Sequence, residues 1–264
     1  MAVDKLVDSA QLDADLSSVA NAIRTKGGTS AQLAFPAGFV SAIQNIPSGG
    51  GGIDINDFAS GAEPDGDITL NVNLRAYAFF RAAHLGKVTM VGNHYLSAYS
   101  FGESSITEFS GVDITSDFTN VGTAFAYSQI KKLTAPKCTN WNSYGLCRGC
   151  AKLETIDCGS TSFTAGVLFD GCNKLQTLIL RSTALVSLGN VALFNNTPLR
   201  GYNGLTATIY IPKTLYDHLD DGTADDYKAA SNWSTMDAGG YITWAKIEGS
   251  YYETHYADGT AISS

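Results

Sequence analysis

All five cysteines of this sequence fall between residues 138 and 172. Two of them have the C-x-x-C spacing found in zinc sites, where thiolates bind the metal. The cysteines also follow a repeat, because Gly-Cys-x-Lys-Leu occurs in both CRGCAKLETIDC and FDGCNKLQTLIL. Buried cysteine behaves as a small apolar residue. We therefore predict that the five cysteines fill the core of a repeat and do not form a zinc site, and we expect no cofactor. The five are Cys138, Cys147, Cys150, Cys158 and Cys172.

The other reactive side chains form no recognisable catalytic group. The sequence has four scattered histidines and contains no G-x-S-x-G, H-E-x-x-H or P-loop motif. Glu154 and Asp157 would suit glycoside cleavage only if they faced one site, and we interpret them as strand surface. The acidic run 217–226 lacks the spacing of a calcium loop. We predict that the protein is not an enzyme.

Aromatic residues in connecting segments and outward positions of expected strands are the candidate ligand-binding residues. Exposed aromatic rings can contact sugars and proteins, although the same rings can pack against their neighbours. The strand face of a solenoid is a common binding surface. The candidates are Tyr95, Tyr99, Trp141 and Tyr144 in connecting segments, and Thr155, Asp157, Thr177 and Ile179 on strands.

A repeated apolar pattern positions these candidates. Ladder residues recur at steps of 21, 24, 23, 22 and 24 residues, each five or six positions after a phenylalanine or, once, Cys147. Such a period is typical of leucine-rich repeats, in which stacked coils enclose a core that one coil cannot. We predict an α+β repeat protein, with a leucine-rich-repeat solenoid of about six coils and a parallel sheet over residues 76–211. The ladder residues are Leu85, Ile106, Ile130, Leu153, Leu175 and Leu199.

The segments on either side of the repeats are predicted to close the solenoid. Residues 53–75 contain the alternating run DITLNV, which suits an edge strand. Residues 212–264 are predicted to form the C-terminal cap, with helices at 214–219 and 225–233. Trp233 and Trp244 would cover the end of the core, and the last residues would form a hairpin around Asp258-Gly259.

Residues 1–47 are predicted to form a small helical module, joined to the rest by a glycine-rich linker at 48–52. Two short amphipathic helices cannot bury much apolar surface alone, so we expect this module to attach to a partner or to oligomerise the chain. We therefore expect a homo-oligomer. The residues expected to make these contacts are Leu12, Leu16, Val19 and Ile23 in the first helix and Phe39, Val40 and Ile43 in the second.

Charge and hydropathy exclude two classes of partner. The net charge is −8 and no cluster of Lys and Arg is present, so we do not expect nucleic-acid binding. No stretch approaches the ~20 apolar residues that span a bilayer, so we expect no membrane insertion. The acidic N-terminal segment does not have the pattern of a secretory signal peptide.

Several motifs carry a family resemblance. Ala76-Tyr-Ala-Phe79, Thr123-Ala-Phe125-Ala-Tyr127 and Phe169-Asp-Gly-Cys172 resemble the BspA-like subclass of leucine-rich repeats, as does the closing run IYIPKTLYDHL…YKAASNWSTM…ITWAKI. The resemblance covers residues 70–247. Weak strand segments such as FSGVDIT leave the coil boundaries within residues 86–145 open.

The segment AIRTKGGTSAQLAFPAGFVSAIQNI resembles the start of tail and other virion proteins of phages that infect gut Firmicutes. The combination implies a phage structural protein of tail, baseplate or fibre type, located in the virion. Its expected partners are other virion proteins and a glycan or protein of the host surface. A bacterial surface or secreted BspA-like adhesin is one alternative, and a polysaccharide depolymerase is another.

Overall fold

The computed structural model describes residues 17, 64–118, 121–164 and 166–262. The predicted linker at 48–52 lies outside the described residues. So do the apolar positions of the predicted N-terminal module: Leu12, Leu16, Val19, Ile23, Phe39, Val40 and Ile43.

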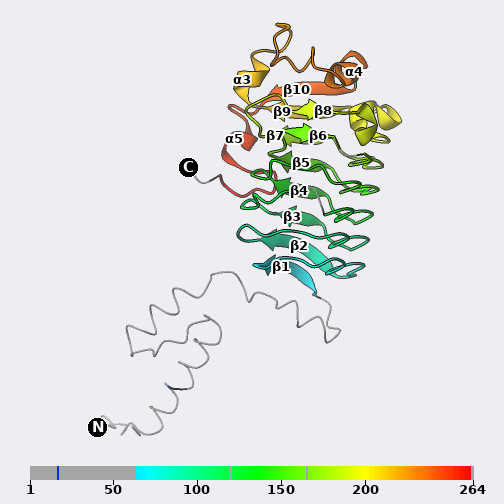
Figure 1. The fold of residues 1–264 in the computed structure, drawn as a ribbon, viewed down its shortest axis with the longest axis vertical. Coiled ribbons are helices and arrows are strands. Elements are labelled where there is room, and N and C mark those ends of the chain that lie inside the picture. The colour runs from blue at the N-terminus through cyan, green and yellow to red at the C-terminus, as the bar shows by residue number, and fades with distance from the viewer. Residues whose placement is uncertain (1–16, 18–63, 119–120, 165, 263–264) are drawn as a thin grey trace, which may run out of the picture. The chain divides into compact units, whose positions relative to one another are not determined.

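Residues 64–262 form a parallel β-solenoid of about five turns (Figure 1). Its main sheet has the strand order β1-β2-β3-β4-β5-β7-β9-β10, and every neighbouring pair is parallel. A second parallel sheet pairs β6 with β8. The strands are β1 Gly66–Leu70, β2 Leu85–Met90, β3 Glu108–Ser110, β4 Lys132–Ala135, β5 Thr155–Cys158, β6 Ser162–Phe163, β7 Thr177–Leu180, β8 Ser187–Leu188, β9 Ala207–Ile211 and β10 Ile242–Lys246.

The register of the main sheet confirms the predicted coil spacing from β2 to β7. Lys87, Glu108, Lys132, Thr155 and Thr177 pair in succession, at steps of 21, 24, 23 and 22 residues. The last coil is longer, because Thr177 pairs with Thr208, 31 positions later, although the predicted ladder residue Leu199 is fully buried and Phe194 stacks on Phe169. Three 3-10 helices lengthen this coil: η2 Val191–Phe194, η3 Pro198–Arg200 and η4 Tyr202–Gly204.

Stacked phenylalanine rings run through the core beside the strands. The rings of Phe79, Phe101 and Phe125 stack with centroids 5.3 and 5.4 Å apart. The ring of Phe169 stacks on that of Phe194 in the next coil, with centroids 5.3 Å apart. Cys147 occupies the equivalent place between these two stacks and is fully buried. The loops that carry these residues, here termed the anchor loops, are joined from coil to coil by main-chain hydrogen bonds of 2.7 to 3.4 Å.

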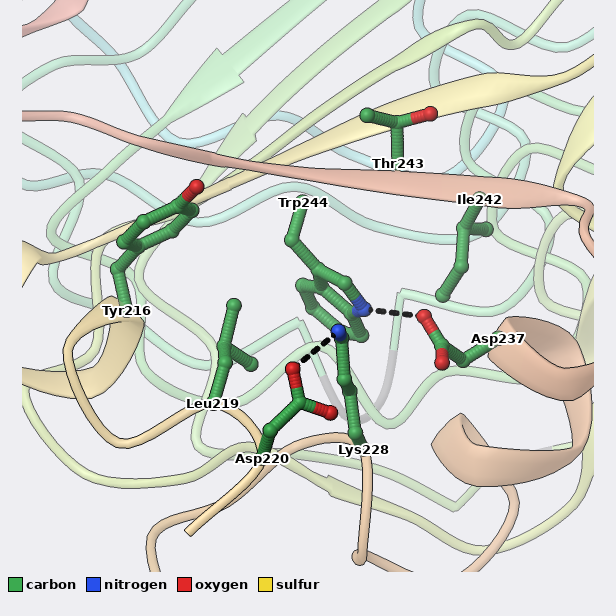
Figure 2. Close-up of a pocket in the computed structure, with 8 residues that line it drawn as sticks. All are labelled: Tyr216, Leu219, Asp220, Lys228, Asp237, Ile242, Thr243 and Trp244. Carbon is green, nitrogen blue, oxygen red and sulfur yellow. Dashed lines mark hydrogen bonds and ion pairs between the residues drawn. The ribbon is translucent and has the colours of Figure 1, made fainter.

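The cap closes one end of the core with aromatic side chains. Trp233 and Trp244 pack against each other with ring centroids 6.0 Å apart, as their positions in the sequence predicted. The cap helices are α3 Lys213–Tyr216 and α4 Trp233–Ala238. The helix predicted at 225–233 was wrong, because Asp226 accepts hydrogen bonds from nearby main-chain N–H groups and holds a turn there. Figure 2 shows Trp244 with its indole N–H directed at Asp237.

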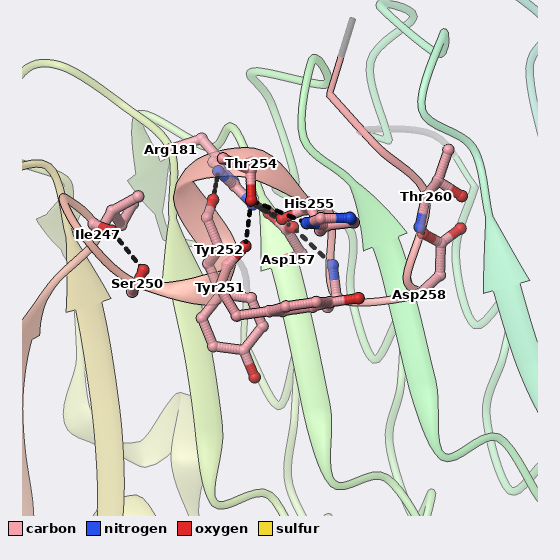
Figure 3. A network of polar contacts seen from close by, with 11 residues as sticks. Asp157, Arg181, Ile247, Ser250, Tyr251, Tyr252, Thr254, His255, Asp258 and Thr260 are labelled. Atoms are coloured by element: carbon pink, nitrogen blue, oxygen red, sulfur yellow. Dashed lines mark hydrogen bonds and ion pairs between the residues drawn. The ribbon is translucent and has the colours of Figure 1, made fainter.

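The last part of the chain leaves the cap and crosses the outer face of the main sheet (Figure 3). It comprises α5 Tyr251–Thr254 and a turn at residues 258–259, closed by an antiparallel bridge between His255 and Ala261. We term residues 251–262 the strap. The strap extends from β9, where the Tyr252 ring contacts Tyr210 at 4.8 Å, to β2, where Asp258 is 3.8 Å from Lys87. The expected turn is therefore present, but it lies on the sheet.

Candidate binding surfaces

The strap covers part of the strand face on which we predicted ligand binding. Thr155 and Thr177 pair with each other, point outward and remain partly exposed. Asp157 and Ile179 also point outward, but both are fully buried. The prediction of these two as exposed ligand contacts was wrong, because the chain's own C-terminal segment occupies the surface above them.

Asp157 holds the strap through an ion pair that is almost completely buried. Arg181 donates from Nε to Asp157 Oδ1 at 2.9 Å and from Nη2 to Oδ2 at 2.8 Å. The same guanidinium donates to two strap carbonyls, those of Tyr252 and His255. The main-chain N–H of Ala257 donates to Asp157 Oδ2 at 3.2 Å. This pair therefore binds the main chain of the strap directly.

The anchor loops carry aromatic side chains that are exposed or partly exposed. We term this set the tyrosine edge and define it as Tyr77, Phe80, Tyr99, Tyr127 and Tyr144. Tyr77, Tyr127 and Tyr144 are each about half exposed or more, at 56%, 49% and 62%. Tyr77 and Tyr99 stack at 5.2 Å, and Phe80 meets both rings edge-on.

Glycines in the anchor loops make room for these rings. A Cβ on Gly149 would lie 2.4 Å from the ring of Tyr127, and a Cβ on Gly102 would lie 2.9 Å from that of Tyr99. Sequence reasoning gave Tyr99 and Tyr144 but did not assign Tyr77 or Tyr127 to the ligand surface. A glycine one repeat after an aromatic residue, such as Gly149 after Tyr127, is the sequence signal that would have indicated an exposed ring at Tyr127.

Two further predicted ligand residues lie elsewhere. Tyr95 is 51% exposed, outside the anchor loops. Trp141 is fully buried, so its prediction as an exposed contact was wrong. Its ring packs against Phe118, and its indole N–H donates to the carbonyl of Cys138 at 3.0 Å. Because the indole N–H, its only polar group, has a buried acceptor, Trp141 can be fully buried in the core.

The five cysteines are free and buried, as the core interpretation predicted. Cys150 Sγ contacts the carbonyl of Phe125 at 2.9 Å, and Cys172 Sγ contacts that of Cys147 at 3.0 Å. Burial raises the pKa of Cys138 to about 11. Within residues 64–262, apart from the gaps, the structure brings together no group of three or more metal-ligating side chains.

The cap contains a cleft of about 440 Å³ beside β10 (Figure 2). Its wall is formed by the loop that follows α3, and its floor by the inward side chains of β10. No helix in the described part of the chain is long and apolar enough to cross a membrane.

No protein-family model, curated protein or solved structure matches the chain.

Proposed function

We propose that this chain is a non-enzymatic structural protein of a bacteriophage particle, with a solenoid of the BspA-like leucine-rich-repeat type. In this proposal residues 1–47 dock to the virion, and the solenoid presents a binding surface to the host or to another virion protein. Support comes from the resemblance of AIRTKGGTSAQLAFPAGFVSAIQNI to virion proteins. It also comes from the regular parallel coils, which form a rigid support for display.

The tyrosine edge is the observation that carries the binding role. The strap occupies the middle of the strand face, whereas Tyr77, Tyr127 and Tyr144 are exposed in the anchor loops of three different coils. Clustered exposed aromatic side chains are typical of interaction sites. Repetition along the solenoid suits a partner with an extended surface, and several copies on one particle would add avidity.

Docking is tested with particles from the source culture. Mass spectrometry of purified virions should detect the full chain. A Leu16→Glu/Ile23→Glu variant should fail to attach to particles that lack the protein, because two charges interrupt the predicted apolar face. Ser17→Glu is the matched control, since Ser17 is exposed. Detection of the protein on bacterial envelopes and not in virions would favour the adhesin alternative.

The display role is tested by adsorption of the protein to host cells. A Tyr77→Ser/Tyr144→Ser variant should lose at least tenfold in affinity, since each exposed aromatic contact contributes about 1 kcal/mol or more. Tyr95→Ser is the control, because Tyr95 is equally exposed but lies outside the tyrosine edge. Equal adsorption of all three proteins would contradict a role for this edge. Release of sugars from host polysaccharide would instead favour the depolymerase alternative.

A further inference from the structure

The anchor loops hold a left-handed backbone at equivalent places in successive coils. Two residues after the anchor residue, φ is +60° at Arg81, +54° at Glu103 and +59° at Tyr127, whereas the next two coils have glycine there, at Gly149 and Gly171. Glycine adopts this conformation freely, but a Cβ makes it unfavourable. The first three coils therefore carry a strained residue where the next two relieve the strain.

Strained residues also occur two positions before the anchor residue. Tyr77 and Tyr99 have φ of +62° and +55° there, whereas a later coil has Gly145 with φ +67°. Val167 shares the conformation one coil further on, with φ +52°. Tyr77 is 56% exposed and the Arg81 side chain is 69% exposed, so burial in the core does not explain the large side chains at these places. Strained residues of this kind concentrate at functional sites.

Four of the strained residues form one contact cluster together with Phe80. We term it the Tyr77 cluster and define it as Tyr77, Phe80, Arg81, Tyr99 and Glu103. The rings of Tyr77 and Tyr99 stack at 5.2 Å, and Phe80 meets both edge-on. Arg81 lies over the Phe80 ring, with Cζ 5.0 Å from the centroid, and donates from Nε to Glu103 Oε2 at 2.7 Å. These contacts hold the side chains in place before a partner binds, which lowers the entropy lost on binding.

The contacts within the cluster favour a protein as its partner. A sugar would stack on an open ring face, but Tyr77 and Tyr99 face each other and Arg81 lies over Phe80. A polyanion would need several uncompensated cations, whereas Glu103 pairs with the only cation of the cluster. Tyrosine and arginine, in contrast, are enriched among the residues that dominate protein interfaces. Because Glu103 binds Nε of Arg81, the two terminal nitrogens of the guanidinium can donate to a carboxylate.

We infer that the Tyr77 cluster binds a protein partner, which places a carboxylate on Arg81 and an apolar side chain against Tyr77 and Phe80. The strained residues are retained in this part of the solenoid because glycine would remove the side chains that bind. This inference rests on the proposed display role, and it names the class of partner for the part of the tyrosine edge in the first two coils.

The test measures binding of the full chain to two preparations from the source culture, envelopes of the host bacteria and purified virions. Each preparation is used intact, after proteinase digestion and after periodate oxidation of its glycans. Arg81→Gly removes the guanidinium, and Arg81→Lys keeps the charge but loses the planar fork. Asn203→Gly is the matched control, because Asn203 is also exposed and left-handed, with φ +56°, but lies outside the cluster.

We expect both Arg81 variants to bind at least one preparation about tenfold more weakly than Asn203→Gly, as loss of a central interface arginine does. That difference should disappear after proteinase digestion and persist after periodate oxidation. The Tm of Arg81→Gly should stay within about 3 °C of the wild-type value, because relief of the left-handed strain offsets the extra disorder of the unfolded chain.

Three results would overturn the inference. A larger fall in the Tm of Arg81→Gly would mean that Arg81 is retained for stability. A difference in binding that periodate abolishes and proteinase spares would identify a glycan partner, and the display role would still stand. Equal binding by the Arg81 variants and Asn203→Gly would exclude the Tyr77 cluster as a binding site. If neither the wild type nor any variant binds either preparation, the proposed display role itself fails, and the inference fails with it.

Discussion

Replacing Arg181 with methionine should release the strap from the main sheet. Methionine retains most of the apolar stem but removes the guanidinium that binds Asp157 and the carbonyls of Tyr252 and His255. Asp157 would remain in a fully buried position, with the N–H of Ala257 as its remaining partner in the strap. The expected consequence is a large loss of stability together with local opening of residues 251–262.

The magnitude follows from the burial of the pair. The side chains of Asp157 and Arg181 are 0% and 14% exposed, and removing one partner of a buried ion pair costs about 3–5 kcal/mol. For a domain of this size, that corresponds to a fall in Tm of roughly 6–20 °C. Arg81→Met is the matched control, because Arg81 and Glu103 form a similarly short ion pair at 2.7 Å with 69% and 39% exposed side chains. This control should cost less than about 1 kcal/mol.

The loss should also depend on pH. Burial raises the pKa of Asp157 in the folded protein, although Arg181 and the Ala257 N–H oppose this shift. The folded state then binds a proton more readily than the unfolded state, so stability falls as pH rises from the unfolded pKa toward the folded one. Removal of Arg181 takes away the main opposing charge and raises the pKa further. The free energy lost by Arg181→Met should therefore be larger at pH 7 than at pH 5.

Denaturant unfolding at the two pH values measures the free energy, and hydrogen exchange measures the opening of the strap. In Arg181→Met, amides of residues 251–262 should exchange faster than those of the core strands. An Arg181→Met/Asp157→Leu double variant should recover much of the stability, because the buried charge is then absent. A loss below about 1 kcal/mol in the single variant, with unchanged exchange in the strap, would refute this account of how the strap is held.

Three further substitutions or treatments follow from the packing of the coils. Gly149→Ala should lower the free energy of unfolding by about 1–3 kcal/mol, because Gly149 has φ +71° and a Cβ there would lie 2.4 Å from the ring of Tyr127. Gly166→Ala is the control and should lower it far less, because a Cβ at Gly166 has room. Phe101→Ala should lower the free energy of unfolding by about 3–5 kcal/mol, since its ring is fully buried between two stacked rings. All five cysteines are buried and free, so their thiols should react with a maleimide only after unfolding, and a chelator should leave Tm unchanged. Rapid labelling of Cys138, or a fall in Tm on adding a chelator, would contradict the prediction that the cysteines fill the core.

The solenoid could be predicted from the sequence because its physical cause repeats. Each coil must bury the same apolar face against its neighbours, so the spacing of Leu85, Ile106, Ile130, Leu153 and Leu175 carries the strand register directly. The same argument gave Cys147 its place between the stacked phenylalanine rings. In the last coil the spacing still placed the buried Leu199, but three 3-10 helices lengthen the coil before β9, and no apolar period marks their length.

The binding surfaces could be predicted only in part. Tyr99 and Tyr144 were expected in connecting segments, but no local pattern distinguishes the exposed ring of Tyr144 from the buried ring of Trp141, three residues before it. Burial depends here on which neighbours the coil above and the coil below supply. Trp141 has Phe118 against its ring and a carbonyl for its N–H, whereas Tyr144 has a glycine beside it.

The sequence by itself determined the coil period, the parallel strands and the residues that close the cap, because each arises from a local or repeated burial of apolar side chains. Only the tertiary structure decided that the strap covers Asp157 and Ile179. The contact between Asp157 and Ala257 joins residues 100 positions apart and occurs once, so it leaves no period in the sequence. Asp157 was interpreted from the sequence as strand surface, but in the structure the strap buries it together with Arg181, and that burial makes their pairing a determinant of stability.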